Sequence, residues 1–217
     1  MEPILNKEYS QADFYLFRSR NYLTTFYSSP DIIQEALKNK DFDKCYEIGR
    51  KLEFGDYEGL QFPIVYREQP ESGKRFRDVL DNRNVAQYLI SDRMKQLLIE
   101  NNITGWKSFP IVMYDKHGKE VPGYNGFSIT GHCGGIVTYH EDICQFDEEF
   151  MWYKGVSIDI DQWDGSDIFN VHAHHIIITK RVYKLFKEHK IDAIEMTSLP
   201  KYRHGFSCIH KASSNCS

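Results

Sequence analysis

Histidine and cysteine are the residue types of this 217-residue chain that could bind a metal ion or act as nucleophiles. Two groups are close enough in sequence to be considered as metal ligands: His172, His174 and His175, and His204, Cys208 and His210. In a strand, His172 and His174 would lie on one face, because side chains alternate between faces. Zinc sites usually show tighter paired spacings than these. We therefore expect these histidines to pack or to face solvent, and we expect no metal ion.

The segment G-H-C-G-G, residues 131–135, could hold a nucleophilic cysteine. Cys133 would then need a base, for which His132 and His140 are the candidates, and a third group to orient that base. The alternative is a glycine-rich turn that contains a partly buried, unreactive thiol. A catalytic Cys133, or a metal site among the histidines, would make the protein a small hydrolase or transferase.

Motifs of other enzyme classes are missing from the sequence. There is no G-x-G-x-x-G after a strand and no G-x-x-x-x-G-K-[ST], the patterns that bind dinucleotides and phosphates. There is also no G-x-S-x-G and no H-E-x-x-H. We therefore expect no cofactor and no catalytic activity.

Acidic residues are concentrated between Glu141 and Asp167, where nine acids face a single lysine, so that this segment carries a charge of −8 and the remainder +4. Large aromatic residues are interspersed among the acids. A solvated loop is the simple interpretation, since runs of charge usually mean only that. The alternative is a surface that binds a basic protein, with aromatic anchors and a field that speeds encounter. The predicted partner-binding residues are Asp147, Glu148, Glu149, Trp152, Asp159, Asp161, Trp163, Asp164 and Asp167.

The elements that position these residues include a stretch that occurs twice, at residues 84–104 and 172–192. At an offset of 88 positions, eight residues match or are similar: Ile90, Ser91, Arg93, Met94, Leu97, Leu98, Glu100 and Ile103 pair with Ile178, Thr179, Arg181, Val182, Leu185, Phe186, Glu188 and Ile191. Each copy predicts a buried strand, a hydroxyl residue as N-cap, a short helix with one apolar face, and a further extended segment. Two such copies suggest a pair of related strand–helix–strand halves.

Shorter signals predict the remaining elements. Residues 14–17 and 60–66 are candidate strands, and S-S-P-D at 28–31 is typical of a helix start, with the helix ending near Asn39. Residues 109–121 predict a hairpin whose turn is 115–118. The expected fold class is α+β, with mostly antiparallel sheets and short packed helices. We divide the chain into an N-terminal α+β portion, 1–75, and a C-terminal portion, 76–217, that holds the duplicated unit; one compact domain is the alternative.

Composition indicates an ordinary globular protein large enough to bury a core. The start of the sequence lacks the features of a signal peptide, and no apolar run approaches the length of a membrane span. Five scattered cysteines without C-x-x-C spacing favour reduced thiols in a cytoplasm. The net charge of −4 does not suggest a nucleic-acid partner.

Two stretches resemble a known family. Residues 91–124, S-D-R-M-K-Q-L-L-I-E-N-N-I-T-G-W-K-S-F-P-I-V-M-Y-D-K-H-G-K-E-V-P-G-Y, look like immunity-type proteins of bacterial polymorphic toxin systems. Residues 165–186, G-S-D-I-F-N-V-H-A-H-H-I-I-I-T-K-R-V-Y-K-L-F, are similar to the signature of the DUF1629 group of that family: an acid–Ile/Leu–Phe triplet, a gap, an apolar strand ending in Ser or Thr, then a helix. The two stretches cover about a quarter of the chain.

This resemblance implies an α+β intracellular protein that binds and neutralises a cognate toxin, without catalysis or cofactor. Many nuclease toxins are basic, and a concentrated acidic surface with aromatic residues suits such a partner. The function expected from the sequence is therefore that of a cytoplasmic immunity protein. The oligomeric state and the identity of the toxin stay open at this point.

Overall fold

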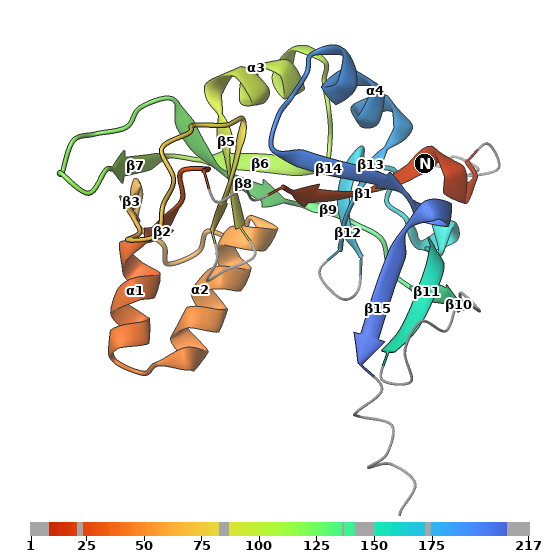
Figure 1. The fold of residues 1–217 in the computed structure, drawn as a ribbon, viewed down its shortest axis with the longest axis horizontal. Coiled ribbons are helices and arrows are strands. Elements are labelled where there is room, and N and C mark those ends of the chain that lie inside the picture. The colour runs from red at the N-terminus through yellow and green to blue at the C-terminus, as the bar shows by residue number, and fades with distance from the viewer. Residues whose placement is uncertain are drawn as a thin grey trace, which may run out of the picture.

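The structure, a computed structural model, describes residues 9–20, 24–82, 87–135, 137–141, 150–171 and 175–207. These residues form an α+β fold with four α-helices and four sheets that are mostly antiparallel (Figure 1). The expected fold class is confirmed at this level. In the described part of the chain, no helix is both long enough and apolar enough to cross a membrane.

The first copy of the duplicated stretch forms a sheet with one helix. Its strands are β4 (Val79–Asn82), β5 (Gln87–Ser91), β6 (Trp106–Phe109) and β8 (Tyr124–Ile129), in the spatial order β4-β5-β8-β6. Helix α3 (Asp92–Glu100) connects β5 to β6. Every neighbouring pair in this sheet is antiparallel. The predicted strand–helix–strand unit is therefore present in this copy.

The second copy forms the same arrangement with a different connection. Strands β12 (Ile168–Val171), β13 (His175–Thr179) and β14 (Ile194–Ser198), with helix α4 (Lys180–Glu188), correspond to β4, β5, β6 and α3. The place of β8 is taken by β1 (Phe14–Ser19), which lies between β13 and β14. A short strand, β9 (Gly131–His132), adds to β12 in parallel. Because β1 belongs to the 1–75 portion, this sheet takes strands from both sides of the predicted division at residue 75.

The two sheets also agree in register. Ser91 lies opposite Tyr124 in the first sheet, and Thr179, 88 positions after Ser91, lies opposite Phe14 in the second. Strands β8 and β1 therefore occupy equivalent positions, although β8 follows its helix in the sequence and β1 precedes its own.

Helices α3 and α4 pack on the same side of the two sheets and close one shared core (Figure 1). This core contains residues from both copies at equivalent positions: Ile90 and Ile178, Met94 and Val182, Leu97 and Leu185, Leu98 and Phe186, Ile103 and Ile191. Burial of these apolar side chains supplies the main driving force for joining the copies. The sequence repeat thus corresponds to a repeat in the core.

The opposite face of each sheet has its own cover. On the first sheet lie α1 (Asp31–Lys38), α2 (Phe42–Phe54) and a small sheet of β2 (Ser28–Pro30), β3 (Ile64–Glu68) and β7 (Ile111–Tyr114). On the second lies a sheet of β10 (Thr138–Glu141), β11 (Phe150–Ser157) and β15 (Arg203–Ser207), together with short 3-10 helices at Gln11–Asp13, Ile160–Gln162 and Leu199–Lys201. The two covers project as separate lobes below the central sheets (Figure 1).

The shorter sequence signals had mixed outcomes. The strand at 14–17 and the turn at 115–118 are confirmed, with the Gly118 N–H donating to the Asp115 carbonyl over 3.0 Å. The predicted helix ends at Lys38, next to Asn39, and its N-cap position is Pro30, the last residue of β2. The strand expected at 60–66 begins only at Ile64, after Pro63, whose missing N–H does not support a central strand position.

Candidate functional site

The acidic segment does not form one surface. Asp147, Glu148 and Glu149 lie outside the described residues, and only the backbone of Trp152, in β11, is described. The other five predicted residues separate into two classes. Asp159, Asp161 and Asp164 are exposed, whereas Trp163 and Asp167 are buried.

Trp163 is part of the core and is not an exposed anchor. Its side chain is 7% exposed and its ring packs edge-on against Phe14 and Tyr9, with centroid distances of 5.1 and 5.0 Å. The indole N–H donates to the Ser166 carbonyl over 3.0 Å, which satisfies the one polar group of the ring. The aromatic surface of Trp163, predicted to contact a partner, is therefore packed inside the molecule.

Residues 159–164, which we call the acidic loop, are fixed to the neighbouring segment by backbone hydrogen bonds. Gly134 N–H donates to the Gln162 carbonyl over 3.0 Å, and Asp164 N–H to the His132 carbonyl over 3.1 Å. The Asp164 carboxylate accepts hydrogen bonds from the N–H groups of His132 and Ser166, over 2.8 and 2.9 Å. These bonds hold the backbone of the loop and the Asp164 carboxylate in place.

Asp167 stabilises the contact between the two copies. Its carboxylate accepts hydrogen bonds from the Thr179 hydroxyl over 3.1 Å, from Arg181 over 3.1 Å and from the Thr104 N–H over 3.2 Å. Thr179 and Arg181 belong to the second copy, while Thr104 belongs to the first. We call this group the Asp167 cluster. The carboxylate of Asp167, predicted to bind a partner, is therefore buried and already accepts hydrogen bonds within the molecule.

An equivalent group surrounds Asp78. Its carboxylate accepts from the Ser91 hydroxyl over 2.8 Å, from Arg93 over 3.1 Å and from the Asp192 N–H over 3.0 Å. Burial opposes ionisation, but these bonds outweigh it and hold the pKa of Asp78 below its ordinary value. The donors of the two groups occupy equivalent positions of the repeat. Ser91 and Arg93 correspond to Thr179 and Arg181, and Asp192 corresponds to Thr104, each at the offset of 88. The Asp78 cluster is therefore the counterpart of the Asp167 cluster.

Two arginines form further hydrogen bonds between the copies. Arg93 donates to the His189 carbonyl over 2.9 Å, at the end of α4, and Arg181 donates to the Asn101 carbonyl at the end of α3. His189 and Asn101 are again 88 positions apart. Each arginine thus binds the aspartate that precedes its own copy in the sequence and the helix end of the other copy, where carbonyl groups lack helical partners.

The Asp78 cluster was missed in the sequence. Its signal is the similarity between R-D-V-L at 77–80 and S-D-I-F at 166–169, which are 89 positions apart. The two aspartates are 89 positions apart, whereas the residues of the main repeat are 88 positions apart. A comparison at the fixed offset of 88 therefore does not align Asp78 with Asp167.

Cys133 lacks the surroundings of a nucleophile. It is 3% exposed, and its thiol donates to the Asp159 carbonyl over 3.2 Å. Burial, and then the negative charges of Asp159 and Asp164, raise the pKa of the Cys133 thiol to about 11. His132 is its exposed neighbour in the chain, and His140 is hydrogen-bonded to Ser157 over 2.6 Å. The structure therefore brings neither candidate base together with Cys133 in a catalytic arrangement.

We expect Cys133 to react slowly with thiol reagents. The thiolate is the reactive form, and a raised pKa and burial both lower its availability. Alkylation of Cys133 by iodoacetamide at about pH 8 should be at least about tenfold slower in the folded protein than in urea. Mass spectrometry of peptides after timed labelling measures this rate. Equal rates in the folded and unfolded protein would contradict the burial of the thiol.

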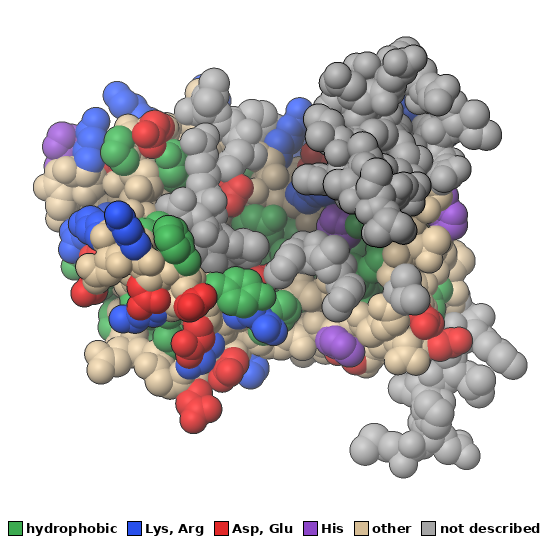
Figure 2. Space-filling model, turned by 90° about the horizontal axis from the view of Figure 1, so that it is seen from below, with side chains coloured by type: hydrophobic (Ala, Val, Ile, Leu, Met, Phe, Trp, Pro, Cys, Tyr) green, Lys and Arg blue, Asp and Glu red, His purple; other side chains and the backbone are tan. Residues whose placement is uncertain are grey.

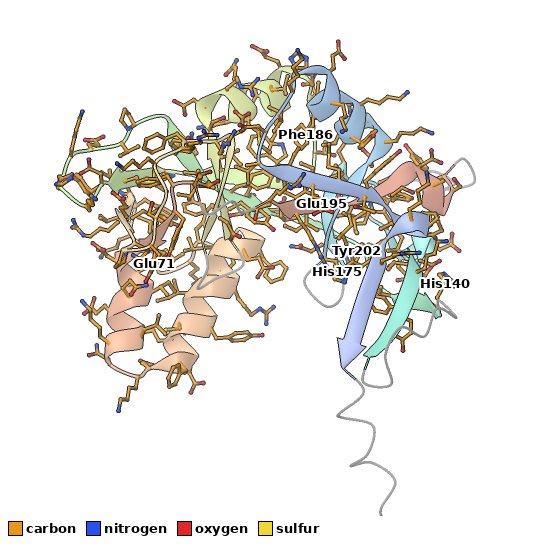
Figure 3. The ribbon with its side chains drawn as sticks, viewed as in Figure 1. Glu71, His140, His175, Phe186, Glu195 and Tyr202 are labelled. Atoms are coloured by element: carbon orange, nitrogen blue, oxygen red, sulfur yellow. The ribbon has the colours of Figure 1, made fainter. Side chains whose placement is uncertain are left out.

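The histidine groups are only partly described. His172, His174, Cys208 and His210 lie outside the described residues, as does the side chain of His204. His175 is hydrogen-bonded to the Tyr139 hydroxyl over 2.7 Å and lies beside Tyr202, at a ring distance of 6.1 Å (Figure 3). Within the described ranges, no group of three or more His, Cys, Asp or Glu residues could hold a metal ion. His175 therefore contributes to packing between β13, β10 and the segment before β15.

An open hollow of about 550 Å³ lies next to the Asp167 cluster. It is lined by Tyr9, Asp13, Lys180 and Arg181, among others, and contains neither Cys133 nor a histidine. Lys180 binds Asp13 over 2.9 Å, and this contact lowers the pKa of Asp13 to about 2. The charged groups at this hollow are therefore paired with one another.

No protein-family model matches the chain, and no curated protein sequence matches it.

Proposed function

We propose that this protein is an intracellular immunity-type protein that binds and neutralises a cognate bacterial toxin, without catalysis and without a cofactor. The resemblance of residues 91–124 and 165–186 to that family supports this proposal. The main structural support for the proposal is the acidic loop. Its carboxylates are exposed, and its backbone is held by several hydrogen bonds. A binding surface that is already rigid loses little conformational entropy when a partner docks.

Within this proposal, the two strand–helix–strand units are related to each other and form a platform for the binding surface. The shared core and the Asp78 and Asp167 clusters join them into one body. The acidic loop is attached to this platform through buried Trp163, whose ring packs against Phe14 of β1. The platform therefore fixes the position of the loop relative to the rest of the molecule.

The partner surface comprises Asp159, Asp161 and Asp164, and not Trp163 or Asp167. Exposed carboxylates attract a basic partner over about one Debye length, roughly 10 Å in moderate salt. Their main effect is to increase the rate of association, because most of the affinity comes from desolvated contacts at the centre of an interface. A toxin with a basic surface is thus the partner that this loop fits.

We expect the double substitution Asp159→Asn with Asp161→Asn to slow association with the toxin by roughly threefold to tenfold at low salt. Both side chains are exposed, and no side-chain bond of theirs is among the contacts of the described residues, so the fold should be unaffected. Asp164 is left unchanged because its carboxylate stabilises the loop. Stopped-flow or surface-binding kinetics over a salt series, with a cognate toxin domain as the partner, measure the rates.

The matched control is Glu35→Gln with Glu188→Gln, which removes the same charge from α1 and α4. This control should leave the association rate nearly unchanged. Equal slowing by both double variants would show that only the net charge matters. Unchanged rates for the Asp159/Asp161 variant would remove the electrostatic part of the proposal, and failure of the protein to suppress the toxicity of that domain would remove the proposal itself.

A further inference from the structure

Helix α2 has an apolar outer face. Phe42 and Tyr46, one turn apart on this helix, are 67% and 63% exposed, the two highest values among the exposed large hydrophobic side chains of the described residues. The inner face of the same helix packs Ile48 and Leu52 into the core under the first sheet. Exposed aromatic side chains in a contiguous group are unfavourable in water and typical of interaction sites.

Two more side chains continue this face toward the end of the helix. Arg50 lies over the ring of Tyr46 at 5.9 Å and over the ring of Phe54 at 5.3 Å. Phe42, Tyr46, Arg50 and Phe54 are each four positions apart, so they follow one side of the helix. We call these four residues the α2 stripe. Tyr and Arg are the residue types enriched among the energetically dominant residues of protein interfaces.

A hollow of about 370 Å³ lies beside the second half of this stripe. It is lined by Tyr46, Glu47, Arg50, Lys51, Phe54 and Asp56. Phe42 projects from the first turn, about 12 Å along the helix axis from Arg50, at 1.5 Å per residue. One helix therefore carries both a projecting aromatic ring and a hollow that such a ring can enter. A twofold contact brings the same surface of two identical chains together, so that surface must be complementary to itself. A projecting ring and a hollow on one helix meet this condition.

The charges along α2 agree with an antiparallel pairing of two such helices. The exposed acids Asp43 and Glu47 lie in its first half, and Arg50 and Lys51 lie in its second half. Lys44 is the exception in the first half. In an antiparallel pair the first half of one helix faces the second half of the other, so that opposite charges meet. Acidic, basic and hydrophobic side chains are mixed on the lobe that includes α2 (Figure 2).

We propose that the α2 stripe is the contact between two copies of this chain, related by a twofold axis that passes near the middle of α2. The Phe42 ring of each copy enters the hollow of the other, and Tyr46 of each copy lies near Arg50 of the other. This inference is independent of the proposed toxin binding, since α2 and the acidic loop belong to the covers of different sheets (Figure 1).

Sedimentation velocity over a concentration series tests this inference. We expect the full chain to form a dimer and Phe42→Ser to raise its dissociation constant by roughly thirtyfold or more, as loss of a central interface residue does. The matched control is Phe76→Ser, because Phe76 is also exposed, at 49%, and its ring packs on Phe26 and Tyr124, which do not belong to α2. The control should dimerise like the original protein, and circular dichroism of both variants should show the same fold.

A charge exchange provides a second test. Glu47→Lys alone and Lys51→Glu alone should each weaken the dimer, because each places like charges together across the twofold axis. Each change also breaks the ion pair that Glu47 and Lys51 form within one helix over 2.9 Å, so circular dichroism should first show that α2 is intact in both variants. The variant that carries both changes should recover most of the association. A full chain that stays monomeric at every concentration, or equal effects of Phe42→Ser and Phe76→Ser, would overturn the inference. So would a monomer that loses toxin binding through Phe42→Ser, since the stripe would then serve another partner.

Discussion

Replacement of Asp78 by alanine should lower the free energy of unfolding by about 2–4 kcal/mol, because a buried carboxylate that accepts several hydrogen bonds is lost. The full cost of breaking a buried ion pair does not apply, since the Arg93 side chain is 55% exposed. The Asp192 N–H and the Ser91 hydroxyl lose their acceptor, and Arg93 keeps only its bonds to the carbonyl groups at the end of α4. Buried donors without acceptors cost about 1–3 kcal/mol each. Urea unfolding followed by fluorescence and circular dichroism measures the change.

The equivalence of the two clusters makes a further comparison possible. Asp167→Ala should have a similar effect, because Asp167 has the same kinds of donors from both copies. The control is Asp161→Ala, an exposed acid whose removal should change stability by no more than about 0.5 kcal/mol. If Asp78→Ala proved as mild as this control, the junction would not depend on these carboxylates.

The pH dependence of this effect has a defined sign. The pKa of Asp78 in the folded protein lies below its ordinary value, so the folded state favours the ionised form. Its contribution to stability is fully present above the unfolded pKa, about 3.9, and is lost as the pH falls through the lower folded value. The difference in stability between the original protein and Asp78→Asn should therefore be constant near neutral pH and decrease below about pH 4.

Replacement of Trp163 by alanine should also destabilise the protein by about 3–5 kcal/mol, the range for large aromatic residues removed from a core. The ring fills space between Phe14, Tyr9 and Phe169, so its removal leaves a cavity in the core. Trp163→Phe keeps most of this packing and loses the hydrogen bond to Ser166, so it should cost about 1–2 kcal/mol. Denaturant unfolding distinguishes the two variants.

This prediction also separates the structural role of Trp163 from the role expected from the sequence. A partner anchor would change binding in Trp163→Phe and leave stability nearly intact. A core residue changes stability and leaves the association rate with the toxin unchanged, provided the variant is folded at the temperature of the measurement. Hydrogen exchange should show increased exchange in the acidic loop of Trp163→Ala, because this ring holds the loop on the body.

The repeated unit could be predicted because its information is local. Apolar residues at helical spacing and a hydroxyl residue before each helix are visible within a short window. The offset of 88 appears when the two windows are compared. The two caps nevertheless differ in mechanism. The Ser91 hydroxyl accepts the Met94 N–H over 3.1 Å as an N-cap does, whereas the Thr179 hydroxyl donates to Asp167. The position of the caps was predictable, but the partner of each hydroxyl depended on tertiary contacts.

The equivalence of β1 and β8 could not be predicted in the same way. Residues 14–19 and 124–129 have no shared offset with the repeat, and each strand reaches its place only by long-range pairing with two other strands. Strand pairing between distant segments leaves little trace in one sequence, since any apolar strand of suitable length satisfies the same pattern. The predicted division at residue 75 did not anticipate this pairing.

The charge of the acidic segment was visible in the sequence, but the burial of its members was not. Asp161 and Asp167 are the same residue type six positions apart, yet one is exposed and the other is buried. The difference arises from Arg181 and Thr104, which come from other elements and surround only Asp167. A count of charges therefore predicts the field of a segment and does not identify which carboxylates are available to a partner.

The position of β1 has a consequence for how the chain is made on the ribosome. Strand β1 leaves the ribosome before all the other strands described here, yet both of its hydrogen-bonded neighbours, β13 and β14, end at residues 179 and 198. The first sheet can be completed once residue 129 has emerged. Strand β1, in contrast, can pair with β13 and β14 only after almost the whole chain has been synthesised. Nascent chains that stop before residue 175 should therefore leave β1 accessible to proteases and chaperones, and full-length chains should protect it.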